Sequence, residues 1–138
     1  MTKWLAVALG GGCGCLCRYW LSGWVYAWLG RGLPYGTLAV NLLGSFLLGL
    51  LMELALRTTL IGEIGRLALC IGFMGGFTTF STFSFETWRL LEAGQWLGAG
   101  LNVVLNVVLC LVGPGLGLAL ARSLEAGCRL SCPVKEGD

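Results

Sequence analysis

Long stretches without a charged residue constrain this chain more than any other feature. Residues 32–52, 67–85 and 93–121 carry no charge, and residues 4–30 are interrupted only by Arg18. A helix needs about 20 mostly apolar residues to cross a bilayer, and membrane-spanning barrel strands instead alternate over about 10 residues. We therefore predict an all-α integral membrane protein with four transmembrane helices. Their expected ranges are 4–29, 35–56, 64–91 and 95–122.

The composition excludes a soluble enzyme and a nucleic-acid-binding protein. Of the 138 residues, 57% are hydrophobic and 12% are charged, against about 25% charged residues in soluble domains. The net charge of +2 is too small to indicate an anionic polymer as partner. We expect residues 1–122 to form one four-helix domain and residues 123–138 a polar tail. Arg18 interrupts the first apolar stretch, which argues against a cleaved signal peptide.

Lysine and arginine counts favour a cytoplasmic N-terminus. Six of these residues fall in the N-terminal arm, the 57–66 loop and the tail, and two fall in the opposite hairpins. Cytoplasmic flanks carry the excess of positive charge in membrane proteins. The six are Lys3, Arg57, Arg66, Arg122, Arg129 and Lys135, and the two are Arg31 and Arg89.

Small residues spaced by four predict closely packed helices. Gly10 and Gly14 form a GxxxG pair, and Ser45 and Gly49 form a small-xxx-small pair. Packing within the chain and packing in a homo-oligomer both explain them at this point. Five of the seven cysteines lie in the apolar stretches, where we interpret them as small hydrophobic residues. The remaining two, Cys128 and Cys132, are interpreted as free thiols in the tail.

Polar and ionisable side chains at membrane depth are costly and usually face a bundle interior or a pathway. In this chain they are Arg18, Asn41, Asn102 and Asn106, together with a dense cluster in the third span. Asn102 and Asn106 share one helical face because they are four residues apart. Hydrogen bonding between helices is the alternative explanation for the asparagines, and a polar lining of a path is favoured slightly.

The third span contains a segment of low helix propensity at its centre. Gly75 and Gly76 precede two β-branched threonines, Thr78 and Thr79, and this sequence favours an opened turn. Opened turns expose carbonyl groups, which discontinuous membrane helices use to hold cations. Residues 75–79 are therefore a candidate cation site built from backbone.

Phenylalanines and hydroxyl residues alternate after this point. Phe77, Phe80 and Phe83 recur every three residues, with Ser81, Thr82 and Ser84 between them. Core packing is the common meaning of such aromatic spacing, but a core stripe would not be interleaved with hydroxyls. Ring edges are electropositive, so ring edges with hydroxyl and amide donors suit a small hydrated anion. Glu86 follows on the Phe83 face, and we expect it in a vestibule or paired with Arg89 or Arg18.

The run GGFTTFSTFSFE at residues 75–86 closely resembles the signature of the Fluc (CrcB) fluoride channels. Supporting matches are GTLAVNLLGSFLLG around Asn41 and the glycine-rich first stretch that ends in Arg18-Tyr19. The resemblance covers about 120 residues. It implies a passive fluoride channel in the bacterial inner membrane, formed by two antiparallel copies of the chain with two pores, and not an enzyme.

The resemblance also implies roles for particular residues. Phe80 and Phe83 match the phenylalanines whose edges approach fluoride, and Asn41 matches a pore-lining asparagine. Ser81 and Thr82 match hydroxyls of a polar track. Carbonyls at the positions of Gly75 and Thr78 hold a structural sodium ion, Na+, at the two-fold axis. The wider expected fluoride pathway adds Asn102, Asn106 and Glu86, and Arg18 is expected to be a structural polar residue.

Two other classes of function are alternatives to the channel. A small proton-coupled drug exporter needs a carboxylate in the first span, where this chain has Arg18. A structural subunit without transport activity would explain the glycine-rich faces, but not the interleaved phenylalanines and hydroxyls. Fluoride stripped of water stepwise along Asn41, the hydroxyls and the ring edges is the mechanism we expect.

Overall fold

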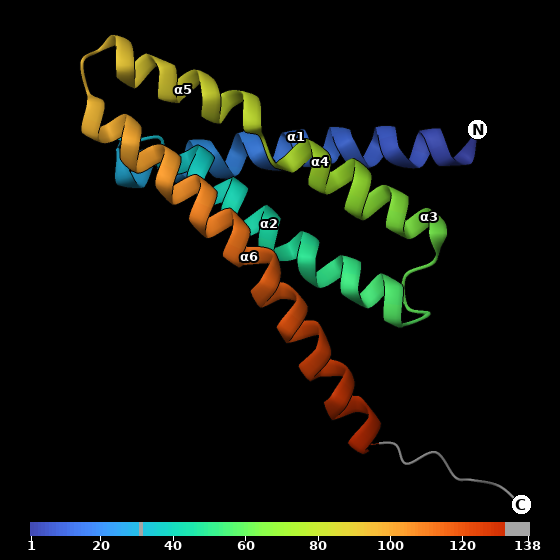
Figure 1. Cartoon of the computed structure of the whole chain (residues 1–138). Helices are drawn as coiled ribbons and strands as arrows, with labels where there is room; N and C mark the ends of the chain where they lie inside the picture. The colour runs from blue at the N-terminus through green and yellow to red at the C-terminus, as the bar shows by residue number, and fades with distance from the viewer. Residues whose placement is uncertain (31, 132–138) are drawn as a thin grey trace, which may run out of the picture.

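The computed structural model describes the backbone of residues 1–30 and 32–131, and the side chains up to residue 126. The described part of the chain is helical and contains no strand. Figure 1 shows long helices packed against one another, with the final helix extending beyond the others toward the C-terminus. The helices are α1 (Thr2–Leu29), α2 (Tyr35–Arg57), α3 (Glu63–Arg66), η1 (Leu67–Phe73), α4 (Met74–Phe77), α5 (Phe80–Glu92) and α6 (Trp96–Ser131).

Three helical runs are long and apolar enough to cross a membrane. They are Tyr35–Arg57, Glu63–Glu92 and Trp96–Ala126. Helix α1 has 28 residues but falls outside this group, since it carries Arg18 and many glycines and tryptophans of low hydropathy. The chain is therefore a multi-pass, all-α membrane protein.

Glycines allow α1 to lie directly against the third helical run. A Cβ atom at Gly10 would lie 2.2 Å from the Ala68 carbonyl oxygen, and one at Gly14 would lie 2.1 Å from the Phe73 carbonyl oxygen. From the other side, a Cβ atom at Gly76 would lie 2.3 Å from the Gly11 carbonyl oxygen. The η1 segment that receives α1 is a π-helical stretch. The GxxxG pair thus packs within the chain.

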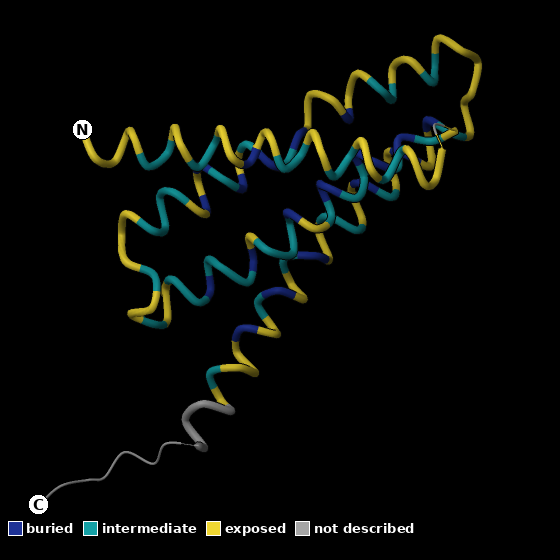
Figure 2. The backbone as a smooth tube through the Cα atoms, turned by 180° about the vertical axis from the view of Figure 1, so that it is seen from behind, coloured by how far each residue is buried: buried dark blue, intermediate teal, exposed yellow. Residues whose placement is uncertain are grey.

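A second glycine interface joins α2 to α6. A Cβ atom at Gly49 would lie 2.4 Å from the Pro114 carbonyl oxygen, and one at Gly117 would lie 2.2 Å from the Phe46 carbonyl oxygen. The second small-residue pair therefore also serves packing within the chain. Figure 2 shows buried residues recurring along α6 where it crosses α2, between exposed residues. Those outward faces carry leucines, valines and tryptophans, as expected for surfaces in contact with lipid or with another chain.

The last helix is longer than the sequence predicts. We expected the fourth span to end near residue 122 and a polar tail to follow, whereas α6 continues to Ser131. Pro114 lies inside this helix. Arg31, Cys132 and Lys135, together with the side chains of Cys128 and Arg129, lie outside the described residues.

Candidate ion pathway at the interrupted helix

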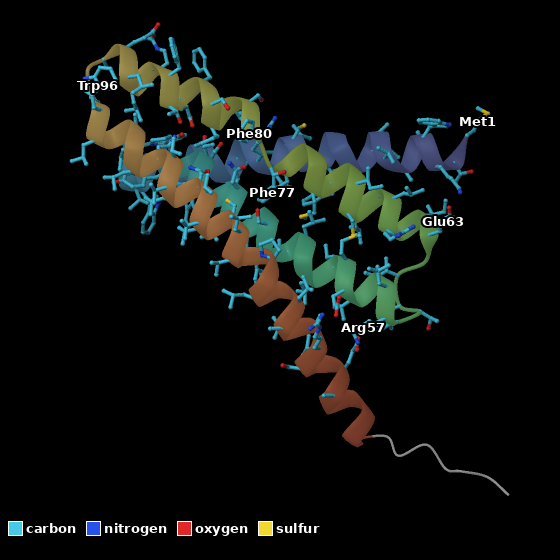
Figure 3. The ribbon with its side chains drawn as sticks, viewed as in Figure 1. Met1, Arg57, Glu63, Phe77, Phe80 and Trp96 are labelled. Atoms are coloured by element: carbon cyan, nitrogen blue, oxygen red, sulfur yellow. The ribbon has the colours of Figure 1, made fainter. Side chains whose placement is uncertain are left out.

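The third helical run is interrupted at two threonines. Thr78 has φ −85° and ψ 157°, and Thr79 has φ −151° and ψ 113°, so both are extended. Both threonines lie within residues 75–79, where the sequence favoured an opened turn, whereas Gly75 and Gly76 remain inside α4. The interruption falls at the threonines because Thr79 caps α5: its hydroxyl accepts a hydrogen bond from the Thr82 amide at 3.2 Å. Figure 3 shows Phe77 and Phe80 on either side of this connection.

Asn41 of α2 holds the extended segment from the side. The Thr79 amide donates to Asn41 Oδ1 at 2.7 Å, and Asn41 Nδ2 donates to the Thr79 carbonyl at 3.1 Å. Both residues are buried, with exposed fractions of 9% for Asn41 and 7% for Thr79. A buried backbone N–H and C=O must find partners, and one amide side chain supplies both. Asn41 therefore substitutes for the helical hydrogen bonds that Thr79 does not make.

This arrangement redirects the donors of two carbonyl groups. In a continuous helix the Thr79 amide would bond to the Gly75 carbonyl and the Thr82 amide to the Thr78 carbonyl. Here the first donates to Asn41 and the second to the Thr79 hydroxyl. The carbonyls of Gly75 and Thr78 are the two for which the family resemblance implies a bound cation. A Cβ atom at Gly75 would meet nothing within 4 Å, so this residue faces open space rather than another helix.

A chain of amides leads away from the interruption along α6. Asn41 Nδ2 also donates to Asn106 Oδ1 at 3.1 Å, and Asn106 Nδ2 donates to Asn102 Oδ1 at 2.9 Å. Asn102 Nδ2 then donates to the Thr87 hydroxyl of α5 at 2.8 Å. The predicted shared face of Asn102 and Asn106 is confirmed. These bonds connect α2, α6 and α5, so the asparagines act as contacts between helices and as a continuous polar line.

A cavity of about 360 Å³ lies beside this line. Phe80 and Phe83 form part of its wall, with ring centroids 5.3 Å apart and ring planes at 54°. Phe83 is buried, whereas Phe80 is 77% exposed, so the cavity opens toward the outside of the chain at Phe80. The lining consists of Asn41, Ser45, Leu48, Thr78, Thr79, Phe80, Phe83, Asn106, Val107, Cys110 and Leu111.

A smaller cavity of about 190 Å³ lies on the other side of Thr79. Arg18, Ser22, Thr37, Thr79 and Thr82 contribute to its lining. Arg18 contacts the Cys15 thiol at 3.9 Å and, in the described part of the chain, forms no ion pair with a carboxylate. A guanidinium group beside hydroxyl groups is a suitable environment for an anion. Thr79 lines both cavities and therefore forms the wall between them.

Glu86 is not paired with Arg89 or Arg18 as we had expected. Its Oε1 accepts a hydrogen bond from the Tyr26 hydroxyl at 2.8 Å, and its buried Oε2 has no partner among the described residues. Arg89 instead bonds to Glu92, with 3.0 Å between Nη1 and Oε2. Glu86 lines an open cavity of about 550 Å³ that also includes Tyr26 and Arg89. This position agrees with the other expectation, a vestibule.

Phe77 does not belong with the other two phenylalanines. It is buried before the interruption and stacks on Phe73, with centroids 5.9 Å apart and planes at 14°. Residues three apart share a face only within a continuous helix, and the extended residues interrupt the helix between Phe77 and Phe80. Phe77 is therefore a core residue.

Ser81 and Thr82 lie in the first turn of α5. The Thr82 hydroxyl accepts a hydrogen bond from the Thr79 hydroxyl at 3.0 Å. Ser81 Oγ lies 3.2 Å from the same Thr79 hydroxyl.

Sequence reasoning missed several residues that line these cavities, among them Ser45 and Cys110, and it missed one role of Thr79. Thr79 was expected in the opened turn as part of the 75–79 segment, but its role as the cap of α5 was not predicted. Ser45 and Cys110 lie four residues after Asn41 and Asn106 on the same helical faces, and this spacing identifies them as lining residues. In the described part of the chain, no three His, Cys, Asp or Glu side chains gather as a metal site.

Apolar spans around an interrupted helix, with cavities lined by amides and hydroxyls, define a small membrane transport protein. The family model described as "CrcB-like protein, Camphor Resistance (CrcB)" matches residues 5–118. The chain belongs to this family.

Proteins of closely similar sequence come from several bacteria, and each is named "Fluoride-specific ion channel FluC". The Geobacter metallireducens protein is 58% identical over 124 residues, which are 90% of this chain and all of that protein. The Geobacter sulfurreducens protein is 59% identical over the same coverage. The Pelobacter propionicus protein is 55% identical over 127 residues, which are 92% of this chain and 98% of that protein.

Proposed function

We propose that the chain is a fluoride-selective ion channel that lets fluoride leave the cytoplasm passively, and that it is not an enzyme. The observation that carries the proposal is the cavity beside Thr79, whose lining brings together Asn41, Asn106 and the side chains of Phe80 and Phe83. This chemistry agrees with the names of the relatives. The membrane potential would drive efflux with roughly 2.3 kcal/mol per charge for each 100 mV.

Fluoride would move along two sets of donors that meet at Thr79. The Asn102 and Asn106 amides and Asn41 form one set, and the hydroxyls of Ser81 and Thr82 form the other. Asn41 Nδ2 uses its two protons on the Thr79 carbonyl and on Asn106 Oδ1. The Asn106 oxygen is the partner that an anion can replace without releasing the backbone of the interrupted helix. The edges of Phe80 and Phe83 would replace further water molecules, because the ring edge is electropositive.

A structural Na+ ion bound by backbone carbonyls fits the chain. The usual helical donors of Gly75 and Thr78 bond elsewhere, and their oxygens are of the type that sodium prefers. Residues with thiolate or imidazole groups are not needed at such a site. When bound, the ion would add positive charge near the pathway and offset part of the desolvation of fluoride.

Two antiparallel copies of the chain would complete the pores in the bacterial inner membrane. Phe80 at 77% exposed and the open space at Gly75 support a partner on this face. A second copy related by a two-fold axis would supply a second set of Gly75 and Thr78 carbonyls. In this assembly α1 would be the fourth span, because packing against η1 and α4 places it beside helices that cross the membrane.

Fluoride efflux from proteoliposomes of the purified protein tests the proposal. The liposomes are loaded with fluoride or with chloride, and release is followed with ion-selective electrodes after a potassium ionophore is added. The proposal requires rapid fluoride release without chloride release. A folded protein that releases neither anion in the presence of sodium would refute it and would favour a structural subunit.

A further inference from the structure

A buried carboxylate near one end of α2 is bound by two arginines from different helices. Glu53 is 8% exposed. Its Oε1 lies 2.5 Å from Arg57 Nε and 2.8 Å from Arg122 Nε. A single acidic group thus holds two cations close together, and the cluster keeps a net charge of +1.

The two guanidinium groups have unused donors. Both contact Glu53 through Nε, and no bond from an Nη atom of either arginine to the described part of the chain is present. Their side chains are 48% and 56% exposed. The outer Nη groups of Arg57 and Arg122 therefore face the surroundings. Each guanidinium can present two parallel N–H groups to an anion.

The cluster lies where the apolar part of the chain ends. Arg57 is the last residue of α2, and Arg122 lies near the end of the apolar run Trp96–Ala126. Figure 3 shows Arg57 at the end of α2, beside the part of α6 that follows the crossing. The exposed side chains Leu56, Leu120 and Leu124 are close to the two arginines in sequence. Paired guanidinium groups suit the phosphate headgroup of a phospholipid, and the apolar side chains next to them suit its acyl chains.

We propose that Arg57 and Arg122, held together by Glu53, bind the phosphate headgroup of an anionic phospholipid where α2 and α6 meet. Phosphate accepts bidentate hydrogen bonds from guanidinium groups, and basic pockets between membrane helices bind anionic headgroups. The neighbouring leucines favour a lipid over free phosphate, because they provide apolar contact for the acyl chains. Glu53 positions the arginines, and the binding does not depend on fluoride conduction.

Thermal unfolding of the detergent-solubilised protein, titrated with short-chain phosphatidylglycerol, tests this site. The expected result is a rise in the unfolding midpoint that saturates, with no such rise for phosphatidylcholine. Arg57→Gln and Arg122→Gln should each weaken the binding about fivefold, in line with one arginine lost from an anionic lipid surface. Arg89→Gln is the matched control, because Arg89 is an exposed arginine paired with a carboxylate at another place, and it should bind like the wild type.

Several outcomes would overturn the proposal. Equal binding by the wild type and both glutamine variants would do so, as would an equal loss in Arg89→Gln, which indicates unspecific attraction. Competition by inorganic phosphate at the affinity of the lipid would identify a free-anion site instead. If a glutamine variant fails to fold, Arg122→Lys decides the question. This variant keeps the charge beside Glu53 but lacks the planar pair of donors. The proposal therefore requires that Arg122→Lys binds the lipid measurably more weakly than the wild type.

Discussion

Replacement of Asn41 by leucine should destabilise the protein by loosening the interrupted helix. The side chain makes three hydrogen bonds, two to the Thr79 backbone and one to Asn106. Leucine has a similar volume, so the change removes the bonds without opening a large cavity. It leaves a buried N–H and a buried C=O of Thr79 without their partner.

The structure sets the size of this effect. A buried polar group left unsatisfied costs about 1–3 kcal/mol. Side-chain hydrogen bonds in membrane proteins average only about 0.6 kcal/mol, with a maximum near 1.7, because the unfolded chain also finds partners in the membrane. For two backbone groups and one side-chain bond, we expect a loss of about 2–4 kcal/mol in the free energy of unfolding.

The measurement is unfolding in mixed micelles with increasing SDS, followed by tryptophan fluorescence. Ser84→Ala is the control, because Ser84 is exposed and bonds only to the Phe80 carbonyl of its own helix. Its effect should stay within about 0.5 kcal/mol. If Asn41→Leu is as stable as Ser84→Ala, the two bonds to Thr79 do not hold the extended segment, and the reasoning is wrong.

Three further predictions concern the pathway, the packing and the cation. Phe80→Leu should slow fluoride efflux at least tenfold with little change in stability, because the ring is exposed but lines the cavity; Phe85→Leu, also exposed, should conduct normally. Gly10→Ala should lower the free energy of unfolding by about 1–3 kcal/mol, since its Cβ would meet the Ala68 carbonyl, whereas Gly100→Ala has open space and should be neutral. Purification with N-methylglucamine in place of sodium should abolish efflux, and added sodium should restore it; efflux that is unaffected would exclude a required sodium ion.

The helical runs could be predicted from the sequence because charge is excluded from them. Residues 32–52 and 93–121 lack charge, and α2 and α6 cover all but the first three residues of each stretch. The end of α6 could not be predicted in the same way. Hydropathy falls after residue 122, but a helix can continue into a polar region when its own hydrogen bonds suffice, and α6 does so to Ser131.

The candidate site was predictable in its residue types but not in its connections. Spacing of four placed Asn102 and Asn106 on one face. Helix propensity located the weak region at residues 75–79 but did not tell which of them leave the helix, and the extended residues are Thr78 and Thr79. The reason is tertiary: Gly76 is held in the helix by close packing on α1, and Thr79 is drawn out by Asn41. A pattern within one segment cannot report a partner from another helix.

In the proposed channel, Thr79 would let one interruption serve two ions of opposite charge. Its amide donates to Asn41, so the Gly75 carbonyl loses its usual donor and can face a cation. Its hydroxyl accepts from the Thr82 amide, which has the same effect on the Thr78 carbonyl. The same residue separates the cavity that contains Phe80 and Asn106 from the cavity that contains Arg18. In the proposed channel, the carbonyls exposed by the interruption attract sodium, while the donors on both sides of it attract fluoride. The two charges would then stabilise each other in the low dielectric of the membrane, and a continuous third helix could provide neither.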